Sequence, residues 1–132
     1  METLAEKINK AQPGEWILVP SNIDIRNIDM NDFSKTRKGM PLFSGCISYF
    51  PDALLAVAEH SRKGNNKHNP GQPLHWAKEK SSDQADCIAR HLVDIGPNWD
   101  NIDPEFNSLH ATALVWRALA LLQTVLERQK CK

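Results

Sequence analysis

The sequence lacks the features of several large classes of protein. Its three cysteines, Cys46, Cys87 and Cys131, are odd in number and widely spaced, which favours reduced thiols over a disulfide framework or a zinc knuckle. The longest apolar runs, around residues 111–115 and 118–122, are far shorter than the roughly 20 residues that span a bilayer. We therefore expect no membrane partner.

An excess of charge of either sign is also absent. Sixteen Lys and Arg residues balance sixteen Asp and Glu residues, so no net field attracts DNA, RNA or an anionic surface. The basic cluster at residues 35–38 is the only feature that favours DNA binding, and we expect no nucleic-acid partner. Residues 1–7 have neither the basic nor the apolar region of a secretory signal. Together with reduced thiols, this predicts a cytoplasmic location.

The first 45 residues carry weak structural signals. Residues 2–11 predict a short helix that ends before Pro13, and residues 16–19 could form a brief strand or an apolar anchor. From residue 21 to residue 45 no hydrophobic period is sustained. We expect an irregular arm there.

A first firm helix is predicted from about Pro51 to Lys63. Proline stands at its start and Gly64 follows its end, as is typical of helix boundaries. Its apolar side comprises Leu54, Leu55, Val57 and Ala58. By the spacing of a helix, Glu59 lies on another side.

A second helix is predicted at about 82–95. Ser81 and Gln84 are spaced as a capping box, and the helix should end at Gly96. Its predicted core stripe comprises Ala85, Ile88, Ala89, Leu92 and Ile95. Another face carries Asp83, Asp86, Arg90 and Asp94.

A third helix, the longest and most apolar, begins near Asp103 or after Ser108 and extends toward Arg128. Strand signals are few after residue 50. An all-α helical bundle is therefore the favoured fold class. Because the third helix is so apolar, we expect it to be buried against another copy of the chain, in a homodimer or homotetramer.

The segment between the first two helices has the character of a site loop. Residues 68–76 contain two prolines and a glycine, so they cannot form a helix, yet they carry large functional side chains. Asn69, His75 and Trp76 are candidates for recognition of a base and sugar. Alternatively, Trp76 is a hydrophobic plug that holds the loop down.

The acidic pair Asp83 and Asp86 is spaced to place two carboxylates on one side of a helix, where they could hold Mg²⁺ or Mn²⁺. Alternatively, Asp83 only complements the positive end of the helix dipole. Glu59 could supply a third carboxylate across the bundle. Its alternative is a solvated salt bridge to Arg62 or Lys63.

Cations near these carboxylates suit a polyphosphate, because a metal and basic side chains together neutralise the anion. The cations around the loop and the second helix are Lys67, Lys78, Lys80 and Arg90, and the candidates among them for phosphate binding are Lys67, Lys80 and Arg90. The alternative is a charge-mixed surface loop. His91 and His110 lie on helices, where they are core histidines by default, or contact substrate phosphate or orient a carboxylate ligand. The histidine spacing matches no standard zinc pattern.

Several short blocks stand in a fixed order between residues 37 and 126. They are Arg37–Leu42, Tyr49–Leu54, His68–Gly71, Leu74–Trp76, Lys80–Ser81, Asp86, Arg90–His91, His110 and Trp116–Ala120. In order and spacing they resemble a phage family, the dATP/dGTP diphosphohydrolases. That family is similar to the all-α nucleoside triphosphate pyrophosphohydrolases of MazG type, whose signature is E-x-x-E on one helix and E-x-x-D on the next.

The resemblance implies a MazG-like all-α domain at residues 37–132, preceded by an N-terminal arm of uncertain structure at residues 1–36. It implies hydrolysis of a purine deoxynucleoside triphosphate, dGTP or dATP, to the monophosphate and pyrophosphate. The catalytic and metal-binding residues would be Glu59, Asp83 and Asp86, with Mg²⁺ or Mn²⁺ as cofactor. The substrate-binding residues would be Lys67, Asn69, His75, Trp76, Lys80, Arg90 and His91.

The sequence departs from the signature at one acidic position. Asp83 and Asp86 can stand for E-x-x-D, but position 56 is alanine, so that only Glu59 remains of E-x-x-E. Asp52, one turn further back on the same side, is a possible replacement. The missing acid motivates an alternative function, a catalytically silent helical module that binds a nucleotide or a partner protein.

Overall fold

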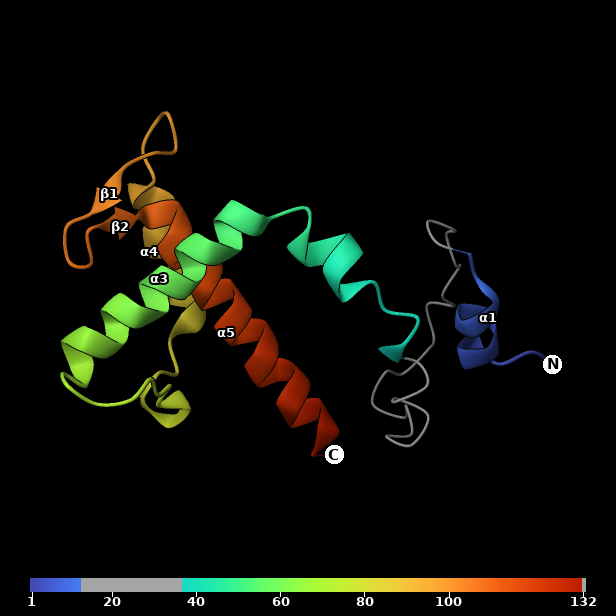
Figure 1. Cartoon of the computed structure of the whole chain (residues 1–132). Helices are drawn as coiled ribbons and strands as arrows, with labels where there is room; N and C mark the ends of the chain where they lie inside the picture. The colour runs from blue at the N-terminus through green and yellow to red at the C-terminus, as the bar shows by residue number, and fades with distance from the viewer. Residues whose placement is uncertain (13–36, 132) are drawn as a thin grey trace. The chain divides into compact units, whose positions relative to one another are not determined.

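The computed structural model describes residues 1–12 and 37–131, and it divides the chain into two compact units, Met1–Tyr49 and Phe50–Cys131. The first unit contains the helix α1, Leu4–Lys10, and one π-helical turn, η2, Phe43–Ile47 (Figure 1). The strand considered at residues 16–19 lies outside the described residues. The arm boundary at residue 36 stays a prediction.

The helix α1 confirms the short helix predicted near the N-terminus. Thr3 and Glu6 form a capping box, in which the Thr3 N–H donates to Glu6 Oε2 at 2.7 Å and the Glu6 N–H donates to Thr3 Oγ1 at 3.1 Å. These bonds satisfy two backbone donors at the start of the helix. At the end of the stretch expected to be irregular, the Ser48 N–H donates to the Phe43 carbonyl at 2.8 Å and closes the π-helical turn.

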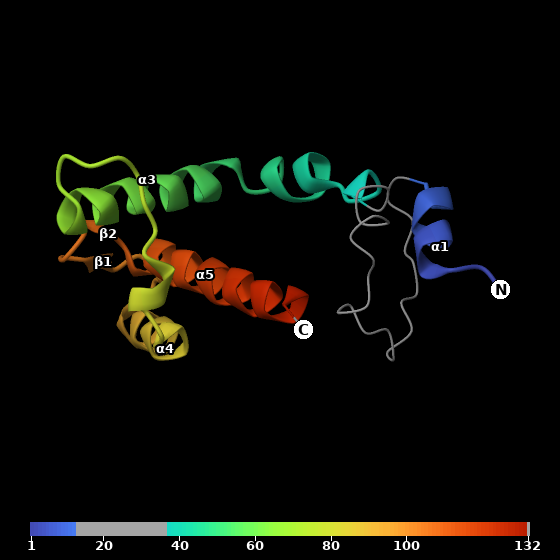
Figure 2. The same ribbon diagram turned by 90° about the horizontal axis from the view of Figure 1, so that it is seen from below.

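The second unit is built on three helices. They are α3, Pro51–His68, α4, Gln84–Asp94, and α5, His110–Lys130. A 3₁₀ turn, η3, Lys78–Lys80, and a short hairpin of β1, Ile102–Asp103, and β2, Ser108–Leu109, connect them. The helix α5 packs against both α3 and α4 and lies between them in Figure 2. The predicted all-α class is confirmed.

The first predicted helix is longer than the sequence indicated. α3 passes through Gly64 and ends at His68, with the Asn69 N–H donating to the Asn65 carbonyl at 2.7 Å. The helix continues because Asn65 is buried and uses its side chain to bind the following loop. The predicted helix end at Gly64 is therefore wrong, because a single glycine is tolerated inside a helix.

The predicted capping box of α4 is wrong. The helix begins at Gln84 with Asp83 as the capping residue, and no side chain caps it. Gln84 is buried and its Oε1 accepts a hydrogen bond from Arg117 Nη1 at 3.2 Å, so it does not bind the start of its own helix. The end was predicted well, because α4 stops before Gly96, whose φ is +84°.

The β-hairpin decides where the longest helix begins. Ile102 pairs with Leu109 and Asp103 with Ser108, and the His110 N–H donates to the Asn101 carbonyl at 2.9 Å. Asp103 is therefore in a strand. Of the two predicted starts, the one after Ser108 is confirmed.

The apolar stripe predicted for α4 is only in part the face that this chain buries. Ile88 and Ile95 are half-buried, but Ala85, Ala89 and Leu92 are exposed, and the buried residues are Gln84 and Cys87. On α3, Leu55 is also exposed, at 71 %. The helical period is as predicted, but the polar Gln84 faces inward because it binds Arg117.

The predicted homo-oligomer stays a prediction. No helix in the described ranges is both long and apolar enough to cross a membrane.

Two glycines provide a matched test of this fold. At Gly96 the φ of +84° is unfavourable for other residues, and an added Cβ would meet the side-chain amide of Asn101. Gly64 is helical, and a Cβ there meets nothing within 4 Å. We expect Gly96→Ala to lower the free energy of unfolding by about 1–3 kcal/mol, and Gly64→Ala to raise it by about 0.5–1 kcal/mol. Urea unfolding measures both, and equal effects would contradict the assigned boundaries.

Candidate functional site

A cleft of about 870 Å³ lies between α3, the segment 69–81 and α5. Its volume is within the range of about 300–1,000 Å³ that is usual for small-molecule sites. Its polar and aromatic lining includes Asn65, Asn69, His75, Trp76, Lys80 and Arg117, with His60, His68, His91, Phe106 and Trp116. Apolar side chains of α5 complete it. Aromatic, amide and cationic groups thus share one concave surface.

The loop along the cleft is held by a single buried amide. Asn65, 9 % exposed, donates from Nδ2 to the Gln72 carbonyl at 3.0 Å and accepts from the His75 N–H at 3.2 Å. Its Oδ1 also lies 3.4 Å from Asn69 Nδ2, which donates to it. Because these partners span the loop, Asn65 fixes the conformation that the prolines and glycine permit.

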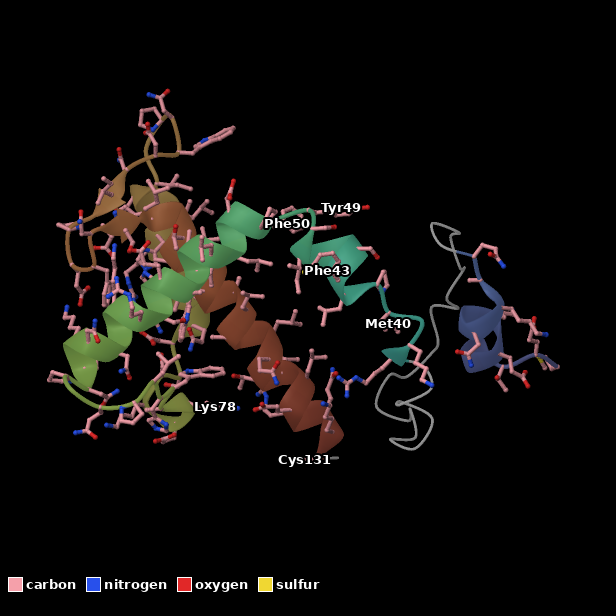
Figure 3. All side chains as sticks on the ribbon, in the orientation of Figure 1. Met40, Phe43, Tyr49, Phe50, Lys78 and Cys131 are labelled. Atoms are coloured by element: carbon pink, nitrogen blue, oxygen red, sulfur yellow. The ribbon has the colours of Figure 1, made fainter. Side chains whose placement is uncertain are left out.

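The aromatic side of the loop is anchored on α5. The rings of Trp76 and Trp116 meet edge to face with centroids 5.8 Å apart. Lys78 Nζ lies 4.9 Å from the centroid of Trp76 and forms an ion pair with Glu127 at 2.8 Å. In Figure 3, Lys78 lies on the loop beside α5. Trp116 Nε1 also donates to Ser61 Oγ of α3 at 2.6 Å. Trp76 therefore both anchors the loop and lines the cleft.

Five of the predicted substrate-binding residues line the cleft, and two do not. Those on its wall are Asn69, His75, Trp76, Lys80 and His91. Lys67 is instead paired with Glu105 and lies over the ring of Phe106. Arg90 donates to Asp83 Oδ2 at 3.3 Å and to Cys87 Sγ at 3.0 Å. Lys67 and Arg90 thus each pair with a carboxylate, Glu105 and Asp83, that does not line the cleft.

Arg117 is the cation that sequence reasoning missed. It is half-buried on the cleft wall, and its Nη1 donates to Ser81 Oγ at 3.0 Å and Gln84 Oε1 at 3.2 Å. It has no carboxylate partner among the described residues. Its position in the block Trp116–Ala120 was the available signal, but nothing local distinguished it from a solvated arginine. A half-buried guanidinium with only neutral partners is suited to bind an anion.

The three predicted metal-binding carboxylates do not meet in the described part of the chain. Glu59 is 55 % exposed beside Arg62 at 3.6 Å and Lys63 at 3.8 Å. Asp83 is 53 % exposed and paired with Arg90, and Asp86 is exposed. None of the three lines the cleft. Together they form no group with donor atoms close enough for one cation, so a Mg²⁺ or Mn²⁺ site on them does not fit this single chain.

The pKa values of Asp83, His60 and His91 are all lowered, but from different causes. Hydrogen bonds from Cys87 and Arg90 lower the pKa of Asp83, which keeps it ionised. Burial lowers the pKa of His60, and the nearby His91 and Arg117 lower it further. Burial also lowers the pKa of His91, although Asp103 opposes that change. Burial therefore favours the neutral form of both His60 and His91.

A second group of potential ligands lies beside the cleft, in a place the sequence did not indicate. His91, Asp103 and His110 each offer a donor atom, and these atoms lie within 4.8 Å of one another. The Nδ1 atoms of the two histidines are 2.9 Å apart. The sequence indicates both histidines as candidates, but it predicts Asp103 near a helix start, so it does not bring the three residues together.

Comparison with known proteins gives one match. The family model described as dATP/dGTP diphosphohydrolase, N-terminal, matches residues 32–132. No curated protein and no solved structure matches the chain significantly. The match covers most of the chain, including every residue that lines the cleft.

The burial of His60 predicts a dependence of stability on pH. Because the pKa of His60 is lower in the folded chain, the unfolded chain binds more protons as the pH falls below about 6.5. We expect the free energy of unfolding to fall from pH 7 toward pH 5, and His60→Gln to reduce that slope. His75→Gln, which removes an exposed histidine instead, is the matched control. Denaturant titrations at several pH values measure it, and equal slopes for wild type and His60→Gln would refute the assignment.

Proposed function

Because the chain belongs to the dATP/dGTP diphosphohydrolase N-terminal family, we propose that it hydrolyses a purine deoxynucleoside triphosphate, dGTP or dATP, to the monophosphate and pyrophosphate. The observation that carries the proposal is the cleft, which combines a half-buried Arg117 with aromatic and amide side chains. A nucleotide needs these three kinds of group, for its phosphates, its base and its hydrogen-bonding edges.

The triphosphate would bind at the end of the cleft that Arg117 and Lys80 line. Arg117 keeps a fixed orientation through Ser81 and Gln84, so its guanidinium loses little freedom when an anion binds. Lys80 is exposed on the cleft wall and would add a second positive charge. Two cations that pair with no carboxylate in the described part of the chain favour a polyanion over a neutral ligand.

The base would lie against the loop. Trp76 offers a ring fixed by Trp116, and His75 and Asn69 offer polar groups beside it. A fixed ring loses little entropy on stacking, and polar groups near its edge can hydrogen-bond a base. The preference for a purine is taken from the family, and the choice between guanine and adenine is left to experiment.

The proposed reaction is attack of water on the α-phosphorus. The water oxygen forms a bond to that phosphorus, the bond from it to the bridging oxygen of the β-phosphate breaks, and pyrophosphate leaves with that oxygen. The attacking water would lose a proton to solvent or to the imidazole of His60 on the wall. Arg117 would stabilise charge on the phosphate oxygens. A divalent metal ion, when bound, would neutralise phosphate charge and activate the water.

A catalytically silent binding module is the competing function, and specific observations favour it. Position 56 is alanine, and Glu59, Asp83 and Asp86 do not form one ligand group. Such a module would bind the nucleotide in the same cleft without cleaving it.

A panel of nucleoside triphosphates with identified products separates these functions. We expect the full-length protein, supplied with Mg²⁺ or Mn²⁺, to release pyrophosphate and the monophosphate from dGTP or dATP, and EDTA to abolish turnover. Pyrimidine triphosphates are the controls. Tight binding with no product after long incubation would support the silent module, and release of inorganic phosphate or of triphosphate would contradict the bond proposed here.

Arg117 provides a sharper test of the binding mode. A charge-assisted hydrogen bond is worth roughly 1.5–3 kcal/mol, so we expect Arg117→Gln to lower kcat/KM by about ten- to a hundred-fold. Arg117→Lys should recover part of this loss. Arg128→Gln removes the same charge from an exposed position of α5 and should change little. A loss equal in Arg117→Gln and Arg128→Gln would show that only net charge matters.

A further inference from the structure

A buried carboxylate lies close to two imidazoles beside the cleft. His91 of α4, Asp103 of β1 and His110 of α5 have donor atoms within 4.8 Å of one another. We propose that these three side chains bind one divalent transition-metal ion. The site is distinct from the exposed carboxylates Glu59, Asp83 and Asp86, which form no such group among the described residues.

Asp103 supplies the first argument. Its side chain belongs to a residue only 7 % exposed, and its Oδ1 accepts a hydrogen bond from the Glu105 N–H at 2.9 Å. Within residues 37–131 it forms no ion pair with a lysine or arginine. Burial of a carboxylate is costly unless the charge is paired or binds a metal. A cation between Asp103 and the two histidines would remove that cost.

The two histidines supply the second argument. Their Nδ1 atoms face each other at 2.9 Å, a geometry in which either a single proton or a metal ion can join them. Two imidazole nitrogens bound tetrahedrally to Zn²⁺, at about 2.0–2.1 Å each, are about 3.3 Å apart. A shift of a few tenths of an ångström would therefore admit the ion.

The backbone around these residues holds them together. The pairing of Asp103 with Ser108 places the carboxylate next to the start of α5, and the bond from His110 N–H to the Asn101 carbonyl fixes that start. His91 lies on α4, which packs against α5. Ligands on such paired elements are preorganised for binding.

The donor set indicates the class of metal. Two imidazole nitrogens and one carboxylate favour Zn²⁺, Mn²⁺, Co²⁺ or Fe²⁺ over Mg²⁺, which prefers oxygen ligands alone. Three protein ligands leave positions open for water or a phosphate oxygen. His91 lines the cleft, so the ion would lie at its wall. That use of the metal rests on the proposed function, whereas metal binding itself does not.

Cobalt titration of the full-length, metal-stripped protein tests the site without nucleotide. Nitrogen-bound Co²⁺ has visible absorption bands, and calorimetry with Zn²⁺, Mn²⁺ and Mg²⁺ gives affinities. The variants are Asp103→Asn and His91→Gln. Asp100→Asn makes the same carboxylate-to-amide change at an exposed position of the same connection and is the matched control. Circular dichroism shows whether each variant folds, and His91→Gln decides alone if Asp103→Asn does not.

We expect one Co²⁺ per chain with visible bands in wild type and Asp100→Asn, and at least ten-fold weaker binding in both site variants. Mg²⁺ should not compete at equal concentration. Unchanged binding in the site variants, no binding by wild type, or loss of binding in Asp86→Asn with Asp103→Asn unaffected would overturn the site. Cobalt binding without nucleotide hydrolysis would refute the proposed function alone, and hydrolysis without cobalt binding would refute the site alone.

Discussion

The contact of α5 with two neighbours at once is the constraint on which the C-terminal unit depends. Successive residues of an α-helix point about 100° apart. Trp116 therefore reaches Ser61 of α3, while Arg117 reaches Ser81 and Gln84 at the start of α4. All three bonds come from one turn of α5. The cleft wall, the position of the Arg117 guanidinium and the start of α4 are consequently set by the rotation of a single helix.

Local signals predicted most of the fold, and contacts between distant residues explain what they missed. Pro51 and Gly96 mark real helix boundaries because their effect on the backbone is local. Gly64 and Gln84 were misread, since Asn65 binds the loop ten residues away and Arg117 binds Gln84 across thirty-three. Of the five predicted substrate-binding residues that line the cleft, Asn69, His75, Trp76 and Lys80 lie in or next to a loop whose prolines and glycine could be recognised. The fifth, His91, lies on α4.

The metal site shows the limit of a signature that is read from sequence. The spacing of Asp83 and Asp86 places both on one helix, but it carries no information about Glu59, which lies on a helix whose main contact is with α5. Asp103 and His110, by contrast, are brought together by a hairpin with strands of two residues each. Strands so short leave almost no alternation of polar and apolar residues, so the sequence alone could not indicate this group.

The ion pair between Lys78 and Glu127 attaches the segment after Trp76 to the C-terminal part of α5. Both side chains are partly exposed, so dissolved salt weakens their attraction. The same salt would weaken the attraction between Arg117 and a triphosphate. Rising ionic strength would thus loosen the attachment of the segment that carries Trp76 and, at the same time, weaken binding of the anion. Occupancy of the cleft would therefore fall more steeply with salt concentration than the loss of either contact alone would cause.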